Sequence, residues 1–149
     1  MSHVVATEVE LHNVAAIKAA CEELGLEFKE GQKTYEWWGF AVGDYPLPTG
    51  FTKEDLGKCE HAIGIPGTTW EVGVCRSKST EGYTLMFDFF GKKGQPILAA
   101  LGGEKQHKFL QSYAIHNTRM FVEKKNGSFR LTKMANNVQR AEIEIEVDV

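Results

Sequence analysis

Cysteine is scarce in this chain, with only Cys21, Cys59 and Cys75 among 149 residues. The three are odd in number and far apart, and they form no Cys-x-x-Cys pair. This pattern argues against a zinc module and against a disulfide framework. We therefore expect free thiols, buried as small apolar residues, in a protein of a reducing compartment.

Long apolar runs and a basic excess are also missing. No segment approaches the roughly 18–20 apolar residues that cross a bilayer, and the start, Met-Ser-His-Val-Val-Ala-Thr-Glu, lacks the basic region of a signal or transit peptide. The net charge is −3, whereas nucleic-acid binders need clustered Lys and Arg for their phosphate contacts. We expect a protein that binds neither a membrane nor nucleic acid.

Catalytic signatures are missing too. No serine lies in a Gly-x-Ser-x-Gly elbow. The turn Gly64–Thr69 has glycines and hydroxyls but lacks the lysine and the helix start of a phosphate loop, so we interpret it as a hairpin turn. The sequence predicts no cofactor and no metal site, and its function is more consistent with binding than with catalysis.

What is present is an ordinary globular composition, 42% hydrophobic and 25% charged. A chain of this length can bury roughly 70% of its unfolded surface and needs no metal or disulfide to fold. We expect one domain spanning residues 1–149.

The pattern predicts strands joined mainly by hairpins, with two helices. Asn13 and Gly25 are suited to cap a first helix, in which Val14, Ile17 and Cys21 recur at helical spacing. The predicted strands are His3–Glu10, Leu26–Phe28, Thr34–Phe40, Cys59–Ile65, Trp70–Cys75 and Tyr83–Phe90, followed after the second helix by Ser128–Met134 and Val138–Val147. The segment Gly43–Gly57 is predicted to be an irregular connection, and Gly91–Gly103 to hold a short apolar segment, Pro96–Leu101, bracketed by glycines.

Lys105–Lys125 is the best-defined helix. Its apolar stripe comprises Phe109, Leu110, Tyr113, Asn117, Met120 and Phe121. The order of elements indicates an α+β fold, with both helices packed on one face of a largely antiparallel sheet, in a ferredoxin-like or related arrangement.

Several motifs, in order along the chain, resemble one family. They are Met1-Ser2-His3, Leu24-Gly25, Trp70–Val74, Gly82–Gly91, Gln111–His116 and Asn126–Leu131. Together they resemble the "hypothetical chloroplast reading frame thirty-five" family of plastid genomes, with cyanobacterial, other bacterial and phage relatives. This chain departs from the family's pattern at Phe89-Phe90, where members have two tryptophans, at Glu71, where Asp is usual, and at Ser112, where Arg is common.

The family is a domain of unknown function, so the resemblance implies no activity. It implies a cytoplasmic protein of a bacterium, a plastid stroma or a phage-infected host cell, and the family's distribution suggests a phage-borne regulator of a host pathway as one alternative. It also singles out His3, Asp88, Tyr113 and His116 as a candidate ligand or site cluster.

Each member of that cluster has a structural alternative. Two imidazoles with Asp88 would suit acid–base or metal chemistry if the first strand and second helix adjoin. Alternatively, His116 is a core-edge residue bonded to a carbonyl or to Asp88. The carboxylate of Asp88, in an apolar strand, must be paired with a residue such as Arg119 or His116, or must cap the next segment. Tyr113 would be core, with its hydroxyl on a polar partner.

Three tryptophans form the aromatic surplus. Trp37 and Trp38 are adjacent, so one should point outward, and with Trp70 they are a possible partner surface. Our leading hypothesis is an accessory or binding protein that recognises a protein partner or a small ligand, and the alternative is an enzyme or metal-dependent protein using His3, Asp88, Tyr113 and His116. The long alternating C-terminal strand makes a homodimer plausible, because open sheet edges pair.

Overall fold

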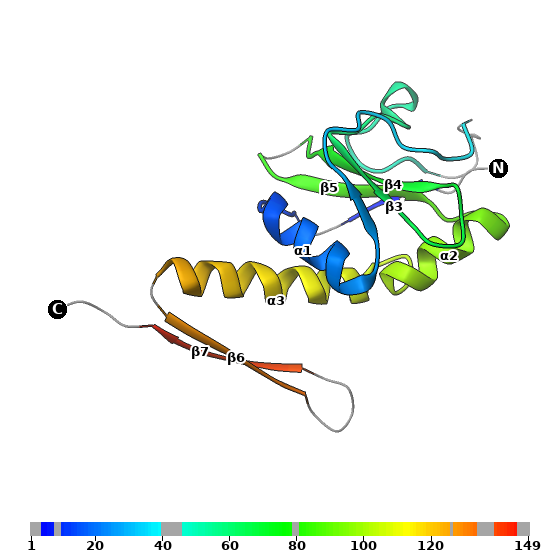
Figure 1. Cartoon of the computed structure of the whole chain (residues 1–149). Helices are drawn as coiled ribbons and strands as arrows, with labels where there is room; N and C mark the ends of the chain where they lie inside the picture. Colours follow the sequence, from blue (N-terminus) through cyan, green and yellow to red (C-terminus); the bar gives the residue numbers. More distant parts are fainter. Residues whose placement is uncertain are drawn as a thin grey trace.

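The computed structural model describes residues 4–7, 10–39, 46–78, 81–125, 127–133 and 139–145, with side chains up to residue 125. It is an α+β fold with a five-stranded antiparallel sheet, as the sequence predicted. The strand order is β1 (Val4–Ala6), β5 (Tyr83–Asp88), β4 (Glu71–Arg76), β3 (His61–Gly64) and β2 (Glu27–Lys29). Three helices, rather than the two predicted, lie on one face of this sheet (Figure 1). The finer expectation of a ferredoxin-like arrangement stays a prediction.

The central meander follows from strict alternation along β4. Trp70, Val72 and Val74 project into the core between sheet and helices, whereas Cys75 belongs to a second core on the opposite face. Val74 pairs with Leu85 of β5, and both are fully buried. The sheet is therefore covered on both faces.

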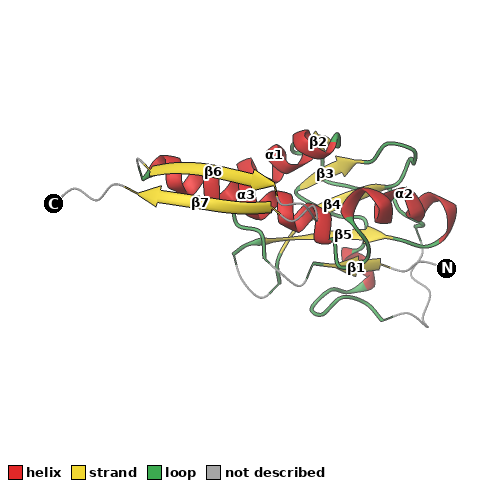
Figure 2. Ribbon diagram, turned by 90° about the horizontal axis from the view of Figure 1, so that it is seen from below, coloured by secondary structure: helices red, strands yellow, loops and turns green. Residues whose placement is uncertain are grey.

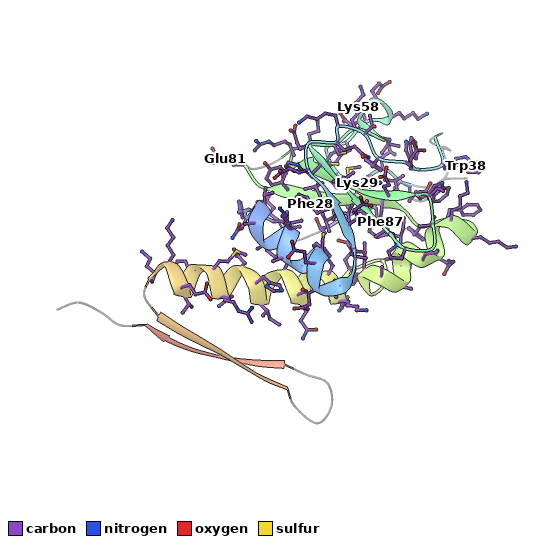
Figure 3. The ribbon with its side chains drawn as sticks, in the orientation of Figure 1. Phe28, Lys29, Trp38, Lys58, Glu81 and Phe87 are labelled. Atoms are coloured by element: carbon purple, nitrogen blue, oxygen red, sulfur yellow. The ribbon has the colours of Figure 1, made fainter. Side chains whose placement is uncertain are left out.

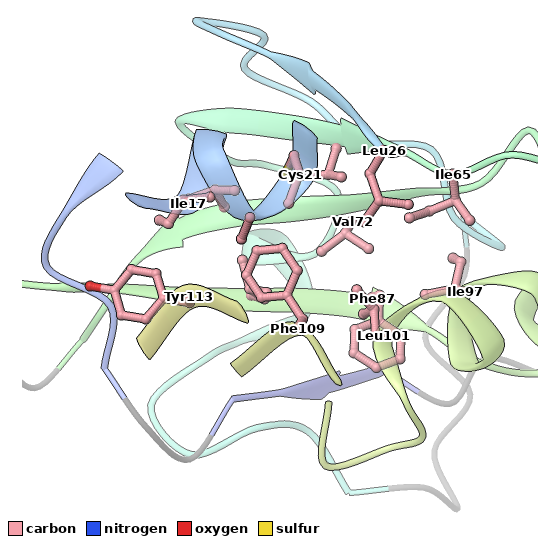
Figure 4. Packing of buried hydrophobic residues seen from close by; sticks show 14 of the residues in the cluster. Ile17, Cys21, Leu26, Ile65, Val72, Phe87, Ile97, Leu101, Phe109 and Tyr113 are labelled. Carbon is pink, nitrogen blue, oxygen red and sulfur yellow. The ribbon is translucent and has the colours of Figure 1, made fainter. Parts of the chain in front are cut away.

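The helix-side core is built from all three helices. Ile17 and Cys21 come from α1 (Val14–Leu24), Ile97 and Leu101 from α2 (Gly91–Leu101), and Phe109 and Tyr113 from α3 (His107–Lys124). These side chains meet Val72 and Phe87 of the sheet, as Figure 4 shows.

The caps of α1 are those expected from sequence. The Asn13 side chain accepts a hydrogen bond from the Ala16 N–H at 3.3 Å, and Gly25 ends the helix in the left-handed conformation, at φ 73°.

The helix α2 was missed, because Gly94 and Pro96 both disfavour a helix interior. The structure gives a reason for Gly94, since a Cβ atom there would lie only 2.3 Å from the carbonyl carbon of Phe89. Glycine lets α2 pack directly on the end of β5.

The predicted strand Thr34–Phe40 is wrong over its described part. Only Thr34 forms a bridge, with Lys58, and Tyr35–Gly39 are irregular. The Tyr35 N–H donates to the carbonyl of Gly57, and its ring lies over Gly73 of β4, where a Cβ atom would be 2.3 Å from the ring. This segment and the short helix η1 (Lys53–Asp55) cover the second face instead of extending the sheet.

The long helix α3 ends in a hairpin of its own sheet. β6 (Gly127–Lys133) and β7 (Gln139–Ile145) pair antiparallel with each other, close to the predicted bounds (Figure 2). The C-terminal half of α3 extends beyond α1 (Figure 1), and accordingly Phe121, predicted to lie on the buried stripe, is 57% exposed. None of the helices in the described ranges is both long and apolar enough to span a membrane.

Candidate functional site

The backbones of Trp38 and Phe90, two exposed aromatic residues, lie close together because one buried carboxylate binds both. The Trp38 N–H donates to Asp88 Oδ2 at 3.3 Å, and the Phe90 N–H donates to Asp88 Oδ1 at 3.0 Å. Trp38 is 46% exposed and Phe90 37%, and these two belong to the three large hydrophobic residues that are exposed in the described part of the chain. Figure 3 shows Trp38 at the end of the molecule where α2 begins.

The carboxylate of Asp88 is fully buried at the last position of β5. Leu85 and Phe87 face the helices and Met86 faces the second core, so alternation directs Asp88 away from the helices. Hydrogen bonds from backbone N–H groups offset the cost of burying a carboxyl group. The sequence prediction that Asp88 must be hydrogen-bonded is confirmed.

Each aromatic residue is followed by a glycine that bends the chain. Gly39 has φ 97° and Gly91 has φ 72°, conformations that residues with a Cβ atom rarely adopt. Among the residues that the structure describes, no atom beyond the chain neighbours comes within 4 Å of a Cβ built on either glycine.

Two lysines continue the same surface. Lys92 and Lys93 are exposed on the first turn of α2, and neither forms an ion pair with any residue that the structure describes. That turn itself has no acidic residue, and the carboxylate of Asp88, which precedes the helix, is buried and bonded to the N–H groups of Trp38 and Phe90. We call Trp38, Phe90, Lys92 and Lys93 the aromatic face.

Tyr113 is a structural residue. Its ring is buried in the helix-side core, and its hydroxyl accepts hydrogen bonds from the N–H groups of His12 (3.0 Å) and Asn13 (3.1 Å). The expectation of a core tyrosine with a polar partner is confirmed. These bonds fix the start of α1 against α3.

His116 joins the same two helices. Its Nε2 lies 3.0 Å from Oε1 of Glu23, and the hydroxyl of Ser112 donates to the other oxygen of Glu23 at 3.0 Å. Because the hydroxyl is bonded to the carboxylate and not to the imidazole, this is not the serine–histidine pair of a nucleophilic enzyme. The sequence analysis predicted that His116 could have a hydrogen-bonding partner. It did not identify Glu23, which lies 93 residues away in the chain.

The expected cluster of four residues is not assembled. The hydroxyl of Tyr113 lies where Leu11 pairs with Tyr83, at the start of β5, whereas Asp88 ends that strand, roughly 17 Å further along at about 3.4 Å per residue. Asp88 faces away from the helices, so the sheet separates it from His116, and the suggested Asp88–His116 pair is wrong. His3 lies outside the described residues.

The three tryptophans divide between surface and core. Trp38 is the outward one of the adjacent pair, while Trp37 packs into the second core, next to Gly57. Trp70 is 6% exposed and belongs to the helix-side core. The suggestion that Trp70 forms part of a partner surface is therefore wrong, because its strand turns it toward the helices.

A second buried carboxylate is Glu71, which the sequence analysis named only as a departure from the family's pattern and not as a site residue. It accepts hydrogen bonds from Lys29 Nζ (2.7 Å), from the Glu36 N–H (3.0 Å) and from Gln32 Nε2 (3.0 and 3.1 Å). Burial opposes its ionisation, but these donors outweigh burial and hold the pKa of Glu71 below its usual value. Glu71 of β4 thus links the side chain of Lys29 on β2 and the segment before Trp37 to the centre of the sheet.

The cysteines are free thiols, as predicted. Burial, with a smaller contribution from neighbouring carboxylates, raises the pKa of Cys21 and of Cys59 to about 12. Burial also raises the pKa of Cys75. Because the thiolate is the reactive form, none of the three is poised for nucleophilic chemistry at neutral pH.

No group of three His, Cys, Asp or Glu side chains within the described ranges is placed to hold a metal ion. Comparison with known proteins found no matching family model, no matching curated protein and no matching solved structure. The resemblance to the chloroplast reading-frame family therefore stays a prediction.

Proposed function

We propose that this protein is a binding module that engages a protein partner through the aromatic face. One observation carries the proposal, namely that the buried carboxylate of Asp88 fixes the backbone of both Trp38 and Phe90 while their side chains remain at the surface. A soluble domain gains nothing for its own core from this arrangement, because the same rings would stabilise it more if they were buried.

Aromatic residues held on a rigid support are well suited to binding. Tyrosine, tryptophan and arginine dominate the binding energy of protein interfaces, and a side chain whose backbone is already ordered loses less entropy on association. The two N–H bonds to Asp88 order the backbone before any partner arrives. Asp88 is therefore a positioning residue of the proposed site and does not itself contact the partner.

A peptide-display selection on the immobilised protein tests the proposal. Peptides enriched on the wild type should lose at least about tenfold in affinity for the Trp38→Ala/Phe90→Ala double variant, because truncating one or two central aromatic residues costs more than about 1.4 kcal/mol. Binding is measured by fluorescence anisotropy of labelled peptides.

Phe121→Ala provides the matched control, since Phe121 is equally a large exposed aromatic residue but lies on the distal half of α3. Peptide affinity should be unchanged in this variant. Enriched peptides that bind the double variant as tightly as the wild type, or that require Phe121 instead, would refute the proposed function.

A further inference from the structure

The charge around the two aromatic rings gives the chemistry of the partner. We infer that the aromatic face binds an acidic segment of a partner protein, in which carboxylate side chains lie next to apolar ones. This inference rests on the proposed function above and adds the chemical class of the ligand.

The positive charge next to the rings comes from two lysines on the first turn of α2. Phe90 directly precedes that turn, so Lys92 and Lys93 are two and three residues beyond one of the exposed rings. Both lysines are exposed and neither is neutralised by an ion pair with a described residue, and no acidic side chain occupies the first turn. A carboxylate placed there meets two ammonium groups.

The apolar part of the proposed binding surface consists of the two aromatic rings. The backbone N–H groups of Trp38 and Phe90 are both bonded to Asp88, and the two side chains are 46% and 37% exposed. Apolar side chains of an extended segment can therefore contact the exposed parts of both rings. A ligand with only negative charge would leave the rings in water, and a purely apolar one would leave the lysines unpaired.

The overall charge decides between an acidic protein segment and a nucleic acid, which also combines stacking with anionic groups. The chain as a whole carries a net charge of −3, and the aromatic face offers two lysines. Nucleic-acid binding needs many phosphate contacts along a basic groove, whereas a short acidic segment needs only a few. The acidic segment fits this surface better.

The test uses the full-length protein and three synthetic probes of equal length. The first probe is a peptide of twelve residues that alternates Asp or Glu with Leu or Phe. The second is the same peptide with Asn and Gln in place of the acids, and the third is single-stranded oligothymidylate. Binding is measured by fluorescence anisotropy at low and at physiological salt.

We expect the acidic peptide to bind about fivefold more tightly than the amide peptide, and this difference to shrink as salt is added, because two exposed ion pairs contribute about 1 kcal/mol together. Lys92→Gln/Lys93→Gln should remove the difference. The matched control is Lys124→Gln/Lys125→Gln, which removes two exposed lysines at the far end of α3. It should leave the difference intact.

The outcomes separate the two proposals. Equal binding of both peptides, together with dependence on Trp38 and Phe90, would overturn the acidic specificity and leave the binding function standing. Peptide binding that is indifferent to Trp38→Ala/Phe90→Ala would overturn both. Oligothymidylate binding tighter than that of the acidic peptide, or loss of the charge preference in the Lys124/Lys125 control, would also overturn the acidic specificity.

Discussion

Single residues in this fold show how a buried carboxylate can be tolerated. Asp88 and Glu71 are both buried, and both accept hydrogen bonds from backbone N–H groups of the segment that follows β2. Each carboxylate therefore fastens an irregular segment to the sheet through groups that a strand would have used for pairing. Asp88 presents the aromatic face, and Glu71 holds the chain that leads to it.

The ionised form of Glu71 should make stability depend on pH. Its pKa is lowered in the folded state, so its contribution is fully present above the unfolded value near 4.5 and is lost as the pH falls through the lower folded value. At pH 7 we expect Glu71→Gln to lower the free energy of unfolding by about 1–3 kcal/mol, because Lys29, Gln32 and the Glu36 N–H lose a charged acceptor with two oxygens. The difference from wild type should shrink in acid, as measured by urea unfolding at pH 7 and below pH 4.

A suitable control for this prediction is Glu60→Gln. Glu60 pairs with Lys33 at 2.9 Å, but both side chains are largely exposed, and such pairs contribute little. If Glu71→Gln were as stable as wild type at pH 7, or no less stable than Glu60→Gln, the hydrogen bonds to the Glu71 carboxylate would not have the stabilising role assigned to them.

At the scale of elements, local signals and close packing differ in how well they can be predicted. The limits of α1 followed from Asn13 and Gly25, because caps act through neighbours in the sequence. The alternation of β4 was equally readable, because each strand face is buried. The helix α2 was not, since its glycine and proline oppose a helix locally and only the contact with Phe89 explains the glycine.

Gly94→Ala tests that explanation. Alanine favours a helix by about 1 kcal/mol over glycine, yet a methyl group here would overlap the backbone of Phe89. We expect a net loss of about 1–3 kcal/mol in the free energy of unfolding, measured with urea, because overpacking forces the backbone to shift.

Gln95→Ala, an exposed change at the next position of α2, should stay within about 0.5 kcal/mol of wild type. A Gly94→Ala protein more stable than wild type would show that propensity outweighs packing at this position and that α2 can move away from β5.

The candidate site was predictable only in part, because its contacts join residues that are far apart in the sequence. A lone aspartate in an apolar strand and a surplus of tryptophans are visible in the sequence. The bond between Asp88 and Trp38 spans 50 residues, and the one between His116 and Glu23 spans 93. Such contacts depend on which strands neighbour each other, and spacing along the chain does not determine that. The repeated pairs Trp38-Gly39 and Phe90-Gly91 were a usable signal for the aromatic face.

For the whole molecule, the described side chains form two cores separated by one sheet. The described side chains of both cores come from residues between Val4 and Met120, and the β6–β7 hairpin contacts α3. A two-stranded hairpin contributes little stability alone, while a covered five-stranded sheet is sufficient for an independent fold.

We therefore expect a chain that stops at Lys125 to unfold cooperatively in urea, with the helical circular dichroism of α1, α2 and α3 retained. Val122, which is 1% exposed near the end of α3, the helix that the hairpin contacts, should show the largest increase in exposure. A broad, non-cooperative transition in the truncated protein would show that the hairpin is part of the folding unit.

The way Asp88 holds the aromatic face has a consequence for evolution and for protein engineering. Asp88 binds main-chain N–H groups, which every amino acid except proline provides. The side chains at positions 38 and 90 can therefore be exchanged without losing the attachment of either residue. A library randomised at these two positions would vary specificity on an unchanged scaffold, so that one ancestral fold could acquire several targets by substitutions that leave its folding intact.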